Sequence, residues 1–87
     1  MISRVGDWIS ARVGDEAMMM SAERGKFIGL TATGTRIWEL LGEPRTVDYL
    51  CTELCREYEI SPTDCRNEVD GFVMEMEKHG ALIAQAV

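Results

Sequence analysis

The sequence predicts an α+β fold in which a three-stranded antiparallel sheet is followed by three helices, close to a winged helix-turn-helix. Apolar and polar residues alternate through the first third of the chain, which is typical of strands. From Thr31 onward the apolar residues recur at helical spacing. Since three short strands cannot bury a sheet face alone, we expect the helices to pack on the sheet.

Three strand segments are expected before Thr31. The first, "WISARVG", alternates, with Ile9, Ala11 and Val13 on one face, and a Gly-Asp turn follows it. The second, "EAMMMSA", contains three adjacent methionines, so at least one of them is expected in the core. The third is "KFIGL", residues 26–30, after a turn of Glu, Arg and Gly. These segments predict a small antiparallel meander.

The first helix is predicted to begin after Thr31 or Thr33, either of which can serve as its N-cap. Its apolar stripe includes Ile37 and Trp38, and Trp38 is expected in the core. A glycine and a proline stop this helix, and a second one follows Thr46. The inward face predicted for the second helix consists of Val47, Leu50, Cys51, Leu54 and Tyr58.

The third helix has a strong start signal in Ser61-Pro62-Thr63-Asp64. A serine N-cap, a proline at the first helical position and an acid at the third together form a variant of the capping box. The helix is expected to end at His79-Gly80, before a short apolar tail, "ALIA". Its predicted buried stripe consists of Cys65, Val69, Phe72, Val73 and Met76.

Size and charge limit the possible functions. With 87 residues, 46% of them hydrophobic, the chain is expected to form one domain, 1–87. Fifteen acidic against nine basic side chains give a net charge of -6, which disfavours nucleic-acid binding. Charges at Arg4, Asp7 and Arg12 interrupt any apolar signal segment, so a cytoplasmic location with reduced cysteines is expected.

Residues that usually carry chemistry show no catalytic pattern. His79 is the only histidine, and one isolated histidine provides no catalytic triad. The spacing of Cys51, Cys55 and Cys65 matches neither zinc nor iron-sulfur motifs, and the glycines of "GKFIGLTATG" do not form a phosphate-binding loop. We therefore expect no enzymatic activity, no metal and no cofactor.

The ordered combination of these segments resembles the PqqD-like proteins, which are RiPP precursor peptide recognition elements. The resemblance covers the core of the domain, about residues 8–84. Two stretches carry the resemblance, "GLTATGTRIWELLGEPRTVDYLCTEL" and "YEISPTDCRNEVDGFVMEMEKHGALI". Thr31 stands where the family commonly has asparagine, and Glu68 where it commonly has aspartate. The matching positions are Leu30, Gly34, Ile37, Trp38, Leu40, Leu41, Arg45, Thr46, Val47, Leu50, Leu54, Tyr58, Val69, Phe72, Val73, Met76, Gly80 and Leu82.

The resemblance implies a binding function. Members of the family bind the leader of a ribosomally made precursor peptide as an added strand, and present it to separate enzymes. The chain lacks the "YPEG" segment typical of proteins of pyrroloquinoline quinone synthesis, and is most similar to the stand-alone proteins of lasso-peptide clusters. The resemblance therefore implies a precursor peptide, a leader protease and a macrocyclase as partners.

The resemblance also indicates where the peptide would bind, between the strand 26–30 and the third helix. Unpaired N–H and C=O groups of an edge strand can pair with a ligand strand. Periodicity leaves open the opposite flank of the helix, with Glu68, Gly71 and Glu75. The residues expected to contact the peptide are Lys26, Phe27, Ile28, Gly29, Leu30, Arg66, Asp70, Val73, Met74 and Glu77.

Two other functions are considered. One is a peptide chaperone for a radical SAM enzyme, as in quinone cofactor synthesis or another RiPP pathway. The other is a winged-helix DNA-binding regulator, which the negative charge disfavours. An open strand edge also allows a homodimer.

Overall fold

The computed structural model describes residues 1–85 and has the expected α+β class. Its main sheet contains β2 (Ile9–Val13), β3 (Glu16–Ser21) and β4 (Lys26–Leu30), antiparallel and in the order β2-β3-β4. The two hairpin turns each contain a glycine with positive φ, Gly14 at 66° and Gly25 at 63°. Few other residues tolerate this conformation, which explains the turn positions.

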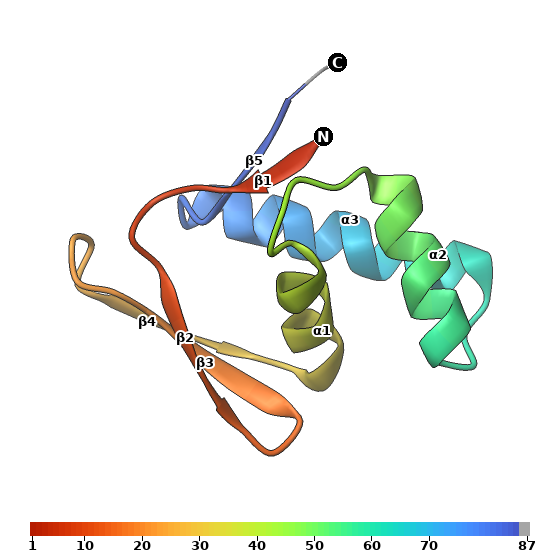
Figure 1. Ribbon diagram of the computed structural model, residues 1–87, viewed down its shortest axis with the longest axis horizontal. Coiled ribbons are helices and arrows are strands. Elements are labelled where there is room, and N and C mark those ends of the chain that lie inside the picture. The colour runs from red at the N-terminus through yellow and green to blue at the C-terminus, as the bar shows by residue number, and fades with distance from the viewer. Residues whose placement is uncertain (86–87) are drawn as a thin grey trace.

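A second sheet joins the two ends of the described chain, and the sequence did not indicate it. β1 (Ile2–Arg4) pairs antiparallel with β5 (Leu82–Ala84), with Ile2 opposite Ala84. Figure 1 shows β1 and β5 side by side at one side of the molecule. β5 packs on α3 (Pro62–Lys78), so the apolar tail closes the far end of the core.

The three helices begin at the caps that the sequence predicts. Thr31 caps α1 (Ala32–Leu40), Thr46 caps α2 (Val47–Glu57), and Ser61 caps α3. In each case the side-chain oxygen accepts a hydrogen bond from a backbone N–H of the first turn, at 3.0 to 3.1 Å. These bonds satisfy amide groups that a helix start leaves unpaired.

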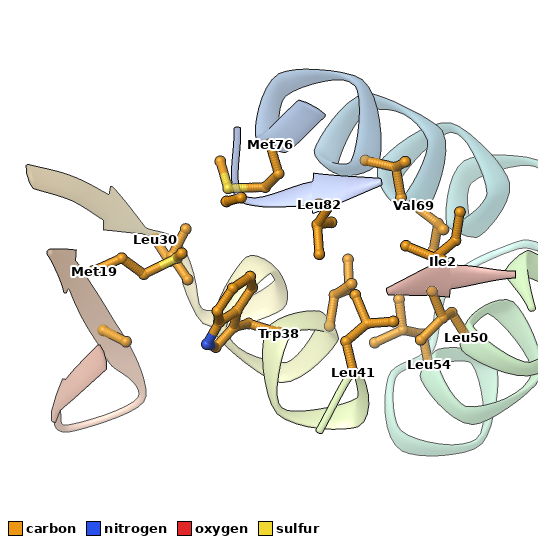
Figure 2. Close-up of a cluster of buried hydrophobic side chains, with 14 of the residues drawn as sticks. Ile2, Met19, Leu30, Trp38, Leu41, Leu50, Leu54, Val69, Met76 and Leu82 are labelled. Carbon is orange, nitrogen blue, oxygen red and sulfur yellow. The ribbon is translucent and has the colours of Figure 1, made fainter. Parts of the chain in front are cut away.

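The core lies where α1 meets the sheet and continues between α1, α2, α3 and β5. Figure 2 shows Met19 and Leu30 of the sheet pointing toward Trp38 of α1, with Met76 and Leu82 above it in the view. Met19 is fully buried and Trp38 is 3% exposed, which confirms both as core residues. The guanidinium of Arg4 lies over the Trp38 ring, 4.2 Å from its centroid, and donates to the Trp38 carbonyl oxygen.

Two details of the predicted pattern are wrong or incomplete. Tyr58 was expected on the inward face of the second helix, but it is the C-cap of α2, has an extended backbone and is 37% exposed. All five residues of β2 are exposed, including Ile9, Ala11 and Val13. β2 is therefore exposed on both faces, and α1 packs on the inner face of β3 and β4.

Candidate functional site

The edge of β4 is open among residues 1–85, because β4 pairs only with β3 there. The cross-strand partners are Met19 with Ile28 and Ala17 with Leu30, which place Ile28 and Leu30 on the inner face of the sheet. Ile28 is half-buried and Leu30 is 6% exposed, so the strand is fixed to the core by its inner face. Its outer edge keeps N–H and C=O groups that another strand can pair with.

A groove of about 730 Å³ runs between this edge and α3. Its apolar side chains come from four segments, and Phe72 of α3 is half-buried within it. Phe72 also lies against Gly34 of α1, where an added Cβ would come within 3.2 Å of the ring. The lining residues are Ile28, Gly29, Leu30, Thr31, Gly34, Ile37, Ile60, Asp64, Asn67, Glu68, Gly71, Phe72, Glu75, Met76 and His79.

The helix side of the groove is acidic. Asp64, Glu68 and Glu75 line it, whereas no lysine or arginine does. Neither Asp64 nor Glu68 forms a salt bridge within the described part of the chain. Glu75 lies 3.5 Å from Nε2 of His79, whose Nδ1 is buried and has no hydrogen-bond partner among residues 1–85. The groove thus combines an apolar floor with a negatively charged wall.

The salt bridges of the arginines lie away from the groove. Arg36 joins α1 to α2 through Glu57, at 2.7 Å, and this pairing lowers the pKa of the Glu57 carboxyl. Arg66 lies 3.2 Å from Asp70 and 3.8 Å from Asp48 of α2. Among the described residues, none of these arginines lines the groove.

The structure brings some of the predicted site residues together. Ile28, Gly29 and Leu30 line the groove, whereas Lys26 and Phe27 are exposed at the start of β4. On α3, the groove is lined by the flank that periodicity left open, Glu68, Gly71 and Glu75. The five helix residues first expected, Arg66, Asp70, Val73, Met74 and Glu77, do not line it, and their contact with a peptide stays a prediction.

The position of Val73 explains this difference in flank. Val73 is 6% exposed and belongs to the core stripe, and Met74 is 61% exposed beyond it. Arg66 faces Asp48 at the start of α2, so this flank of α3 turns toward α2 and solvent rather than toward β4. The groove residues Ile60 and His79 were missed because helical periodicity carries no signal for them: Ile60 lies in the connection between α2 and α3, and His79 is the C-cap of α3.

The thiols of Cys51 and Cys65 have no features of nucleophiles. Burial raises the pKa of Cys65 to about 12, and also raises the pKa of Cys51. The Sγ of Cys65 lies 3.3 Å from the carbonyl oxygen of Cys51, within the contact between α2 and α3. Among residues 1–85, no three His, Cys, Asp or Glu side chains are grouped so that they could hold a metal ion, and no helix is long and apolar enough to cross a membrane.

Comparison with known families agrees with this geometry. The family model for coenzyme PQQ synthesis protein D (PqqD) matches residues 16–82. The chain belongs to the PqqD family. The matched range runs from β3 to the start of β5, so it contains both walls of the groove. A search of curated proteins found no match.

Two solved structures have the same fold as this PqqD-family chain. One is TbiB1 in complex with the TbiA(beta) leader peptide, with a TM-score of 0.86 and 25% sequence identity. The similarity covers 98% of this chain and 99% of that one. The other is a lasso peptide synthetase B1 complexed with the leader peptide, with a TM-score of 0.82, 17% identity, and coverage of 95% and 98%. The second likeness concerns the fold alone.

Proposed function

We propose that this protein binds the leader of a ribosomally made precursor peptide as an added strand at the open edge of β4. The observation that carries the proposal is the groove, which runs along an unpaired strand edge and has a mostly apolar floor. Pairing gives the peptide backbone hydrogen bonds whatever its sequence, and the groove selects the side chains that face α3. The leader peptide bound by the structurally similar TbiB1 supports this assignment.

The protein then delivers the bound peptide to a leader protease and a macrocyclase of a lasso-peptide pathway, without catalysing a reaction itself. The structural likeness to TbiB1, which was solved with a leader peptide, supports the binding role. The sequence resemblance to the stand-alone proteins of lasso-peptide clusters supports a lasso pathway. The raised pKa of the buried Cys65 thiol and the position of His79 at a helix end are consistent with a binding role.

A second candidate is a peptide chaperone for a radical SAM enzyme. The observation that favours it is the family description itself, which refers to coenzyme PQQ synthesis. Both candidates use the same groove and differ in the enzyme that receives the peptide. Pull-down with the affinity-tagged protein separates them, because an iron-sulfur enzyme is retained in one case and a leader protease in the other.

DNA binding is disfavoured by the charge of α3. In a winged helix-turn-helix the third helix would enter the major groove. Here that helix exposes Asp64, Glu68, Glu75 and Glu77, which repel phosphates.

The proposal is tested with fluorescently labelled peptides that cover the N-terminal parts of the short open reading frames next to this gene. We expect one of them to bind saturably in an anisotropy titration, and to be displaced by the same peptide without label. Failure of every such peptide to bind would refute leader recognition. Because an open edge can also pair with a second copy of the chain, sedimentation is measured with and without peptide.

A further inference from the structure

The solvent-facing side of the main sheet has a gap at Gly29. The cross-strand pairs Ala11 with Met18 and Met18 with Gly29 form one row across this face. The row ends at the open edge of β4 without a side chain. A Cβ added at Gly29 would have no other atom within 4 Å, so packing does not require a glycine here.

Backbone conformation does not require this glycine either. The glycines with positive φ are Gly6, Gly14, Gly25 and Gly80, and Gly29 is not among them. Within a strand, glycine weakens the sheet and often marks a place where another group approaches closely. The gap thus has a stability cost that the described structure alone does not explain.

A hollow of about 390 Å³ lies at this gap, lined in part by Val13, Met18 and Thr31 together with Gly29. The apolar side chains around it are exposed: Val13 by 78%, Met18 by 44% and the neighbouring Phe27 by 71%. Exposed apolar side chains gathered in this way are typical of a contact surface.

We propose that this hollow is a second peptide subsite, which takes one large apolar side chain from the residue of the added strand directly opposite Gly29. The inference rests on the proposed strand addition at β4. Residues directly opposite on neighbouring strands point to the same face, with their Cβ atoms about 5 Å apart. Because Gly29 has no side chain, an aromatic or long aliphatic residue there can lie across it and reach Met18, on the next strand.

The peptide would therefore be recognised on both of its faces. Its residues opposite Ile28 and Leu30 point into the groove, and the residue between them points into the hollow at Gly29. Large side chains placed over a strand glycine compensate for the missing side chain. The expected ligand is an extended peptide with three consecutive apolar positions, the middle one aromatic or long and aliphatic.

The test fills the hollow and looks for coupling to one peptide position. Gly29→Val adds a side chain that favours strands and meets no atom at its Cβ, and Gly29→Ala is a milder second variant. Ala11→Val is the matched control, since it adds bulk to the same exposed face on β2 at a residue that does not line the hollow. Thermal unfolding of each variant confirms that it is folded.

The probe is the labelled leader peptide of the co-encoded precursor, with its alanine-scan set. We expect Gly29→Val to weaken binding about tenfold or more, as for loss of one buried apolar side chain, and Ala11→Val by less than about twofold. Alanine substitution at one peptide position should lower the affinity for the original protein by about tenfold. The same substitution should change the affinity for Gly29→Val little.

Two results would overturn the subsite. One is unchanged affinity of Gly29→Val, and the other is a loss that no single peptide position accounts for. Either result, obtained while the original protein binds the leader, removes the subsite and leaves strand addition intact. Absence of binding to the original protein removes the proposed function and the subsite with it.

Discussion

Substitutions at Gly71 allow the stability of α3 to be tested separately from peptide binding in the groove. It lies inside the helix, is exposed, and lines the groove beside Phe72. A Cβ at this position would have no atom within 4 Å, so Gly71→Ala introduces no clash. Glycine costs a helix interior about 0.8–1.0 kcal/mol relative to alanine. We therefore expect Gly71→Ala to raise the free energy of unfolding by about 0.5–1 kcal/mol and the Tm by about 2–8 °C.

Gly71→Leu extends the same argument to function. Leucine is also a good helix former, so this variant should be at least as stable as the original protein. Its side chain projects from a groove-lining position, and we expect the affinity for the leader peptide to fall by about tenfold or more. Glu77→Leu is the control, because it adds the same side chain to α3 outside the groove.

The assays are a thermal melt followed by circular dichroism and an anisotropy titration with labelled leader peptide. A lower Tm for Gly71→Ala would contradict the position of this residue inside a regular helix. Unchanged affinity for Gly71→Leu, with a loss for Glu77→Leu, would show that the peptide lies on the other flank of α3.

Three further predictions concern charge, core and pH. In titrations at low salt, Glu68→Lys should lower the affinity for a leader that contains lysine or arginine by about three- to tenfold. Glu77→Lys should lower it by less than about twofold. Equal losses would contradict the flank assignment. Leu54→Ala removes a fully buried side chain and should cost about 2–5 kcal/mol in urea unfolding; a loss below about 1 kcal/mol would contradict its burial. Hydrogen bonds from the Ser21 hydroxyl and a backbone N–H lower the pKa of Asp7 in the folded state. The Asp7 carboxylate therefore stabilises the fold at pH values above its unfolded-state pKa. This stabilisation is lost as the pH falls through the folded-state pKa. Asp7→Asn should flatten the acid side of the stability profile, and an unchanged profile would contradict that role.

The helix boundaries could be predicted because their signals are local. The caps at Thr31, Thr46 and Ser61 depend on side chains within three residues of the amide groups that they satisfy. The β2-β3 and β3-β4 turns were equally readable, since Gly14 and Gly25 permit the positive φ that each turn needs.

The β1-β5 sheet and the groove flank of α3 could not be predicted, because both depend on contacts between segments far apart in the sequence. The pairing of Ile2 with Ala84 joins opposite ends of the described chain, and three-residue strands have no periodicity to detect. Which flank of α3 lines the groove depends on the rotation of this helix about its axis relative to β4. The apolar stripe is wide, so the sequence defines this rotation only approximately. Val73 illustrates the problem, because it belongs to the same stripe as Val69 and is a core residue rather than a groove residue.

Isotope-edited NMR of the complex tests strand addition most directly. With labelled protein and unlabelled leader peptide, we predict backbone-to-backbone NOEs between the peptide and β4, together with slowed amide exchange along the β4 edge. NOEs should also connect peptide side chains to the ring protons of Phe72 and the Hα protons of Gly71. NOEs to the edge of β2, or binding without any backbone NOE to β4, would contradict strand addition at the groove.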